Sequence, residues 1–350
     1  MSIDWQLAAT VGKKVARPGP VTTGYTMTAA REELAASAVA AEAPVREITG
    51  LADGLPVPTA QILDRDGWIE AATLSMSSML DPSEPDEKPG ISGRIAGVQA
   101  GGLLALLSGA ILGQYDPFTP DPSTGTDGVL MLVTPNIIAV ERALRVVPSD
   151  FRLWVCLHEV THRVQFSANP WLRDYMSSNV EALTSDTGES SSEMVARISS
   201  ALRDRRGSAS ESGESSGQQR EKGIVGAMQL LQSPEQYEAF SRMMMLGTLL
   251  EGHADHVMDA VGPAKVPTVD RIRASFDKRR ARPQNPVQRL LRALLGMDAK
   301  LAQYVRGKAF VDEVVGAVGM TRFNAIWTGP ETMPLPAEIE QPRLWIDRVL

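Results

Sequence analysis

Residues 151–170, FRLWVCLHEVTHRVQFSANP, contain two histidines four positions apart, with a glutamate directly after the first. On an α-helix, side chains four apart project from one face, so His158 and His162 could bind one tetrahedral metal ion from the same side. Glu159 lies on the adjacent face, where its carboxylate would reach a water on the ion rather than the ion itself. The spacing therefore predicts metal-assisted hydrolysis, with the two histidines as ligands and Glu159 as the base.

The alternative is a helix face on which two histidines recur without function. Against it, the chain contains only four histidines, and all of them lie in two short segments. The first segment is apolar around the two imidazoles, and buried imidazoles need polar partners or a metal. We therefore favour the metal site.

A catalytic zinc ion usually has three protein ligands, so a third must come from elsewhere in the chain. The second histidine segment, LLEGHADHVMD, offers as candidates Glu251, His253, Asp255 and His256. At about 100° per residue, Glu251, Asp255 and Met258 share one helix face, and His253 points almost opposite to Glu251. Two sets stay open: Glu251 as ligand with Asp255 orienting an imidazole, or His253 as ligand with His256 nearby.

Composition excludes several classes of protein. A net charge of −7 and a pI near 5.3 argue against a protein that binds nucleic acid by neutralising phosphates. Cys156 is the only cysteine, so neither an intrachain disulfide nor a cysteine-rich zinc site can form. The N-terminal residues lack an apolar run of signal-peptide length, which favours a cytoplasmic location. Nothing in the sequence indicates the oligomeric state.

The patterning around these motifs is mostly helical. Helices are expected over 28–47, opened by Thr28, and after Asp66. The apolar, glycine-rich segment 96–114 is expected to be a closely packed core helix rather than a membrane span. No nucleic acid or membrane partner is expected.

Between that segment and the motif helix, residues 114–128 carry three prolines and are expected to be irregular. Residues 129–136, VLMLVTPN, predict a short strand, and 137–147 return to helical spacing. Ser149 and Asp150 offer an N-cap for the helix that carries the histidines. Residues 204–222 are so rich in serine, glycine and charge that we expect a flexible insertion. Near the C-terminus, Trp327 and Trp345 are expected to anchor the tail on the body.

Taken together, the two histidine segments resemble the gluzincin metallopeptidases, in which a glutamate on a later helix completes the H-E-x-x-H pair. Glu251, Ala254 and Asp255 match that arrangement, although 88 residues separate His162 from Glu251. More closely, the chain resembles the bacterial zincin-like metallopeptidase type 2 family, in GGLLALLSGAILGQYDPF, LHEVTHRVQF, LLEGHADHVMD and the closing segment from Phe323. Some members have been labelled as associated with deazaflavin-coenzyme biosynthesis, but no residue here indicates that link.

The resemblance implies a mainly α-helical (α+β) fold, a zincin-like helical core with a small β-sheet. One such unit is expected, with residues 1–170 and 171–350 as its two lobes. It also implies Zn²⁺, a peptide or protein substrate, and Glu159 activating a zinc-bound water for attack on a carbonyl. His253 and His256 are candidates for stabilising the oxyanion, or are structural.

Two other functions stay open. A non-catalytic zinc scaffold or partner-binding protein would usually have four protein ligands and would not need Glu159. A hydrolase acting on small-molecule amides would use the same residues on a different substrate.

Overall fold

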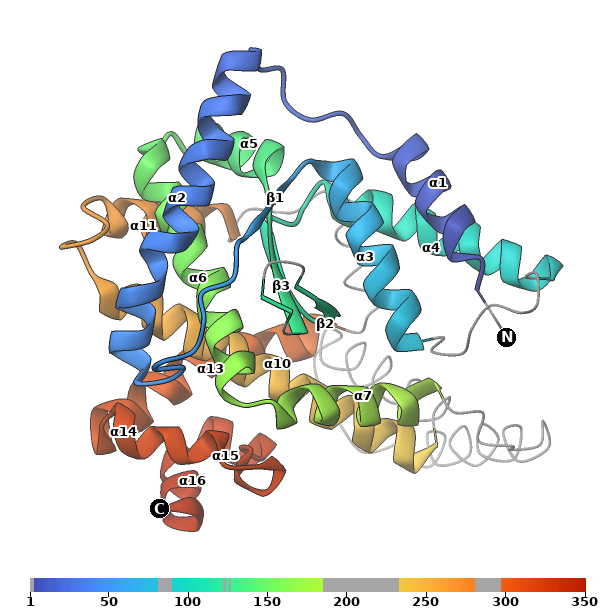
Figure 1. Ribbon diagram of the computed structural model, residues 1–350. Coiled ribbons are helices and arrows are strands. Elements are labelled where there is room, and N and C mark those ends of the chain that lie inside the picture. The colour runs from blue at the N-terminus through green and yellow to red at the C-terminus, as the bar shows by residue number, and fades with distance from the viewer. Residues whose placement is uncertain (1–2, 81–89, 122–123, 126, 185–232, 281–296) are drawn as a thin grey trace, which may run out of the picture. The chain divides into compact units, whose positions relative to one another are not determined.

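The structure is a computed structural model that describes residues 3–80, 90–121, 124–125, 127–184, 233–280 and 297–350 (Figure 1). The expected flexible insertion at 204–222 lies outside these residues. The chain divides into two compact units, of which the first comprises Met1–Arg173, His253–Arg282 and Val315–Thr328. The second comprises Asp174–Gly252, Pro283–Val314 and Gly329–Leu350.

The expected C-terminal lobe, residues 171–350, is therefore not one unit. The break after Arg173 lies close to the expected boundary, but later segments return to the first unit. The reason is packing: helix α11 (Val269–Arg280) contacts both α5 (Thr134–Leu144) and α6 (Pro148–Ala168). Its Ile272 is fully buried in the core of that unit.

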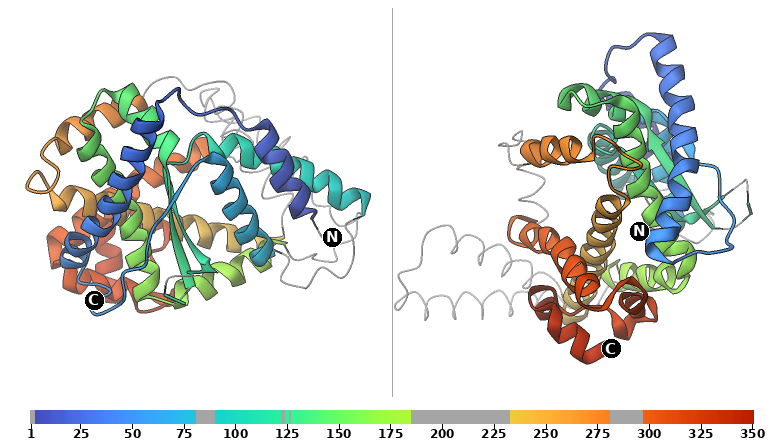
Figure 2. Two further views of the ribbon diagram at one scale, coloured as in Figure 1. Left: turned by 45° about the horizontal axis from the view of Figure 1, so that its top comes forward. Right: turned by 90° about the vertical axis from the view of Figure 1, so that its left-hand side faces the viewer.

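A small sheet forms the centre of the first unit (Figures 1 and 2). Its strands are β1 (Gln61–Leu63), β2 (Gly113–Pro120) and β3 (Asp127–Val133), in the order β1-β3-β2. Strand β3 pairs parallel with β1 and antiparallel with β2. The prediction of a mainly α-helical protein with a small sheet is confirmed.

Helices cover both faces of β3, because its side chains alternate between two apolar cores. Leu130 and Leu132 pack with α6, α11, the C-terminal part of α10 (Pro234–Val261) and α2 (Gly24–Thr49). The intervening Val129, Met131 and Val133 pack with α3 (Arg65–Leu80) and α4 (Ile91–Ser108). A strand buried on both faces carries a continuous apolar run, and this run is what made β3 predictable.

The prediction that residues 114–128 are irregular is wrong for the part that forms β2. Proline is tolerated in β2 because this is an edge strand, where a missing N–H breaks no ladder hydrogen bond. The register also shifts between Asp116 and Pro120, as expected where prolines interrupt pairing.

Helix α4 corrects a second expectation. Its glycines do allow the close contact predicted for them: a Cβ added at Gly97 or Gly101 would lie 2.5 Å from the backbone oxygen of Asp4 or Ala8, the latter in α1 (Trp5–Val15). Its other face is exposed, however, and only 28% of the segment is buried. Of the described helices, α4 is the one that is long and apolar enough to cross a membrane.

The helix that carries the histidines begins differently from the prediction. Pro148 occupies the first helical position of α6, which its fixed φ favours. Asp150 does not cap this helix, because its carboxylate accepts hydrogen bonds from Thr268 N and Oγ1 at 2.9 and 2.6 Å. Leu157, Val160 and Val164 form an apolar stripe along α6 and are fully buried. Likewise, helix α2 begins four residues before Thr28 and is capped by Thr23.

The second unit is built from helices. Its described elements are most of α7 (Trp171–Thr184), of α10 and of α13 (Met297–Val318), together with η2 (Pro330–Thr332), α15 (Pro336–Glu340) and α16 (Pro342–Val349). Helices α10 and α13 cross closely, because a Cβ added at Gly252 would lie 2.3 Å from the Gly307 carbonyl carbon.

Trp345 is fully buried, with its ring 6.0 Å from that of Phe310. In the first unit, Trp327 of η1 (Asn324–Trp327), which follows α14 (Met320–Phe323), is also buried. Both tryptophans therefore anchor the tail, as predicted.

Candidate metal centre

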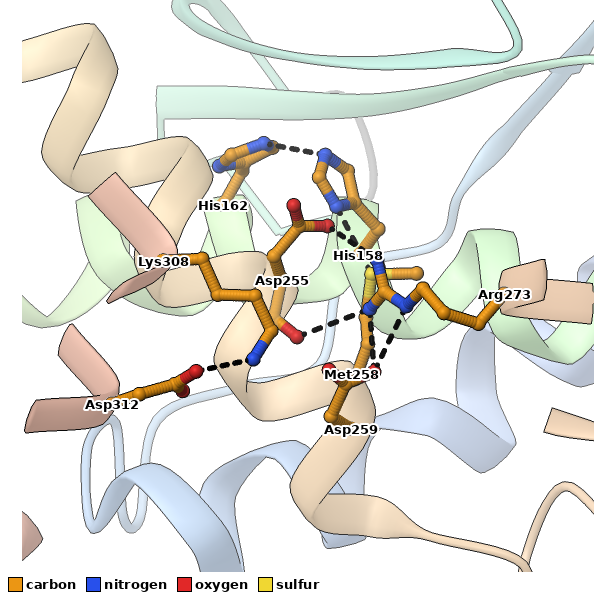
Figure 3. Close-up of polar contacts among 8 residues, drawn as sticks. All are labelled: His158, His162, Asp255, Met258, Asp259, Arg273, Lys308 and Asp312. Atoms are coloured by element: carbon orange, nitrogen blue, oxygen red, sulfur yellow. Dashed lines mark hydrogen bonds and ion pairs between the residues drawn. The ribbon is translucent and has the colours of Figure 1, made fainter. Parts of the chain in front are cut away.

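Helix α6 places the two motif histidines together. Nε2 of His158 lies 3.1 Å from Nε2 of His162, and the two rings are nearly perpendicular, at 88° (Figure 3). Both side chains are half-buried. The predicted pair on one helix face is thus present in the structure.

The opposite nitrogen of each ring has its own partner. Nδ1 of His162 lies 2.9 Å from Oε1 of Gln165, an acceptor that requires a proton on Nδ1. Nδ1 of His158 lies 3.2 Å from the Sδ atom of Met258, a weak acceptor (Figure 3). With both protons on Nδ1, the two Nε2 lone pairs converge on one point.

This geometry fits a shared metal ion. Two nitrogen ligands at about 2.0–2.1 Å from a tetrahedral zinc ion stand roughly 3.3 Å apart. The observed 3.1 Å is close to that value. Two lone pairs facing each other at this distance would repel, so a cation between them is the natural complement.

Glu251 is the candidate third ligand. Among the described residues, His158, His162 and Glu251 each offer one ligand atom, and these atoms lie within 4.8 Å of one another. Glu251 is carried by α10, two residues before His253 on the same helix. Glu251 and Met258 are seven positions apart, so both lie on nearly the same helix face.

Asp255, one turn after Glu251, lies beside a cation. Its Oδ1 atom is 3.3 Å from an Nη atom of Arg273, which also binds Asp259 at 2.5 Å (Figure 3). The Arg273 guanidinium in turn lies 5.4 Å from the ring centroid of Trp154. The structure thus gives Met258 as a contact of the His158 Nδ1 atom, and the predicted orienting role of Asp255 stays a prediction.

His253 lies in a different environment from the metal-ligand group. It is fully buried against the rings of Phe323 and Trp327, at centroid distances of 5.6 and 5.3 Å. Burial, together with the nearby His256 and His162, lowers the pKa of His253 to about 3, so the ring is neutral at neutral pH. His256 is half-buried on the same helix, and an oxyanion role for either residue stays a prediction.

Gln165 connects His253 to the metal-ligand pair. Its Oε1 accepts from His162, so its amide Nε2 donates to Nδ1 of His253 at 2.9 Å. This chain of hydrogen bonds fixes which nitrogen of each imidazole carries the proton. Partners of this kind orient ligand imidazoles and strengthen metal binding. The sequence did contain a signal for Gln165, because it stands three residues after His162 on the same helix.

We predict that Gln165→Leu weakens zinc binding by about 10–100-fold, because His162 loses the acceptor for its Nδ1 proton. Gln165→Glu is the matched control, since a carboxylate oxygen can replace the amide oxygen and should retain most of the affinity. Competition with a zinc-binding dye measures both variants. Equal affinity for wild type and Gln165→Leu would show that Gln165 has no part in orienting His162.

Glu159 is held against the sheet. Its side chain is only 7% exposed, and it packs on Gly113 at the start of the edge strand β2. A Cβ added at Gly113 would stand 2.7 Å from Cγ, 2.8 Å from Cδ and 2.9 Å from Oε1 of Glu159. Only glycine leaves room for the carboxylate here. This contact joins two segments far apart in the chain, so no sequence pattern could have indicated it.

Gly113→Ala is expected to displace the Glu159 carboxylate and to lower the turnover number about tenfold or more, because small misplacements of a reacting group are costly. Zinc content should stay at the wild-type level, since Glu159 is not one of the proposed metal ligands. Gly102→Ala is a suitable control, because an added Cβ there meets nothing within 4 Å. Unchanged turnover in Gly113→Ala would contradict the positioning role.

Comparison with known proteins shows the family of the chain. The model of the family of zincin-like metallopeptidases matches residues 3–346. The chain belongs to the zincin-like metallopeptidase family. The family implies a metal, usually zinc, and the group of His158, His162 and Glu251 could hold one.

A solved structure of similar fold comes from Chloroflexus aurantiacus, a protein to which a hydrolase function and a novel fold have been ascribed. It is 29% identical, with a TM-score of 0.67, and the match covers 99% of this chain and 98% of that one. No curated protein matches the chain significantly. The zincin-like family and this structure both support a hydrolase.

Proposed function

We propose that this zincin-like protein is a zinc-dependent hydrolase that cleaves peptide bonds. The observation that carries the proposal is the convergence of the His158 and His162 Nε2 atoms at 3.1 Å, with both Nδ1 atoms beside acceptors. Glu251 would complete the ligand set. When bound, a zinc ion lowers the pKa of water and polarises a carbonyl group.

Glu159 is proposed as the general base and acid. Its carboxylate follows the first ligand on α6 and is held by Gly113, so its position is fixed before substrate binds. It would accept a proton from the attacking water and return that proton to the leaving amine nitrogen. A purely structural metal site would not require a buried carboxylate at this position.

The edge strand of the sheet supports a peptide as substrate. The strand predicted within residues 129–136 corresponds to β3, which is the central strand of the sheet. Strand β2 lies at the edge and runs beside Glu159. An extended peptide could pair with such an edge by main-chain hydrogen bonds.

The test is hydrolysis of a casein-derived peptide pool, followed by mass spectrometry, together with a panel of small amides. Zinc-loaded wild type should cleave peptides, lose activity with a chelator and recover it when zinc is restored. Cleavage of the small amides alone would indicate a small-molecule hydrolase. No cleavage of either by zinc-loaded protein would favour a non-catalytic zinc scaffold.

A further inference from the structure

A cavity of about 200 Å³ lies in the first unit, beside β2 and the C-terminal end of α6. Most of its wall is apolar, formed by Leu55, Pro56, Pro58, Tyr115, Pro117 and Phe166. Sites for small-molecule ligands usually measure about 300–1,000 Å³. The cavity is therefore better suited to one side chain than to a whole cofactor.

The cavity adjoins the candidate metal centre along two elements. On β2, Tyr115 follows Gly113 by two residues, so both face α6. Gly113 contacts Glu159 of that helix, and the Tyr115 ring lies 5.7 Å from the ring of Phe166. Two residues of a strand span about 6.8 Å. On α6, Phe166 follows His162 by one helical turn, or about 6 Å. The distance from the Glu159 carboxylate to the start of the cavity is therefore about the length of two residues of extended chain.

The aromatic wall of the cavity is fixed in place. The Tyr115 hydroxyl forms a hydrogen bond with Ser167. It also requires Gly128, where an added Cβ would lie only 1.8 Å from the phenol oxygen and where φ is +110°. A wall held in this way is preorganised, so a ligand spends little free energy on ordering it.

The charged side chains at the cavity neutralise each other. Arg173 and Asp127, both part of its lining, form an ion pair. The described lining residues therefore offer no unopposed charge to a ligand. Placing a lysine or glutamate side chain there would remove it from water without a counter-ion, which is costly.

The strand beside the cavity presents its backbone for pairing. The N–H of Val133 donates to Leu112 O at 2.8 Å. Since hydrogen-bonding direction alternates along an antiparallel strand, the N–H and C=O groups of Gly113 and Tyr115 point away from β3. None of the described strands pairs with β2 on that side. A peptide extended along β2 would direct every second side chain towards α6.

We propose that this cavity is a specificity pocket that takes a large, uncharged apolar side chain of an extended peptide, about two residues from the cleaved bond. The proposal rests on the peptidase function proposed above. It narrows the substrate class to peptides carrying leucine, phenylalanine or a similar residue near the cleavage site.

The test uses peptides that differ at one position only, occupied by Ala, Leu, Phe, Lys or Glu. Wild type should cleave the Leu and Phe peptides with kcat/KM at least about tenfold above the Lys and Glu peptides. Leu55→Asp, which adds a carboxylate to the wall, should lose that preference and favour Lys. Val57→Asp is the matched control: it lies on the same loop and is exposed, but is not part of the lining, and should behave as wild type.

A second readout separates this proposal from the catalytic one. Fluorescence anisotropy measures binding of the same labelled peptides to the zinc-loaded Glu159→Gln variant, in which cleavage is not required. Tighter binding of Leu and Phe peptides without cleavage by wild type would support the pocket and contradict the peptidase. Equal cleavage and equal binding of all five peptides, or identical behaviour of Leu55→Asp and Val57→Asp, would overturn the pocket.

Discussion

Glu159→Gln is expected to lower peptide hydrolysis by about 10²–10⁴-fold, the usual contribution of a positioned general base. Glutamine has nearly the same shape as glutamate, so it should fit against Gly113 without moving α6. It cannot accept a proton from the attacking water, however. Zinc content should stay at the wild-type level, because Glu159 is not one of the metal ligands.

The control for that experiment is Glu47→Gln, the same chemical change at an exposed position of α2. Steady-state rates on one cleaved peptide, with zinc measured in the same samples, provide the comparison. Loss of zinc in Glu159→Gln would mean that Glu159 is itself a ligand. Activity of Glu159→Gln equal to that of wild type would show that Glu159 is not the general base.

The largest expected effect on stability concerns Arg163, the residue after the second ligand. Its side chain is 2% exposed and pairs with Glu42 of α2, which is 8% exposed. Burial lowers the pKa of Arg163 to about 10, so the guanidinium is still charged at neutral pH. Removing Glu42 leaves that charge buried without a counter-ion, at a cost of about 3–5 kcal/mol.

We therefore predict that Glu42→Leu lowers the free energy of unfolding by that amount in urea denaturation. The double variant Glu42→Leu/Arg163→Met should recover most of the loss, because replacing both partners of a buried ion pair by apolar residues is often neutral. If Glu42→Leu alone lowers the free energy of unfolding by less than about 1 kcal/mol, the buried pair stabilises the protein no more than a typical surface ion pair does.

Local sequence information was enough for the helix that carries the chemistry. The spacing of His158, Glu159 and His162 and the buried stripe of α6 both follow from one helical period, which the sequence displays directly. For the same reason, the contact of Gln165 with His162, three residues earlier, could have been predicted. The continuous apolar run of β3 identified the strand but not its central place in the sheet.

Tertiary contacts account for what the sequence did not indicate. Gly113 leaves room for the carboxylate of Glu159, which is 46 residues away in the chain, and Met258 contacts His158, which is 100 residues away. The β2 strand was missed because its prolines suggested a loop, and only its edge position explains why they are tolerated. The face of α4 opposite α1 could not be assigned from composition, since glycine-rich apolar segments suit buried and exposed helices alike.

Zinc content per chain, measured by elemental analysis after zinc loading and removal of excess, tests the central claim most directly. We predict about one zinc ion in wild type, Glu159→Gln and His253→Ala, and loss of zinc in His158→Ala and Glu251→Ala. Zinc lost from His253→Ala but kept in Glu251→Ala would show that His253, and not Glu251, is the third ligand. Wild type without zinc, or His158→Ala with as much zinc as wild type, would contradict the metal centre itself.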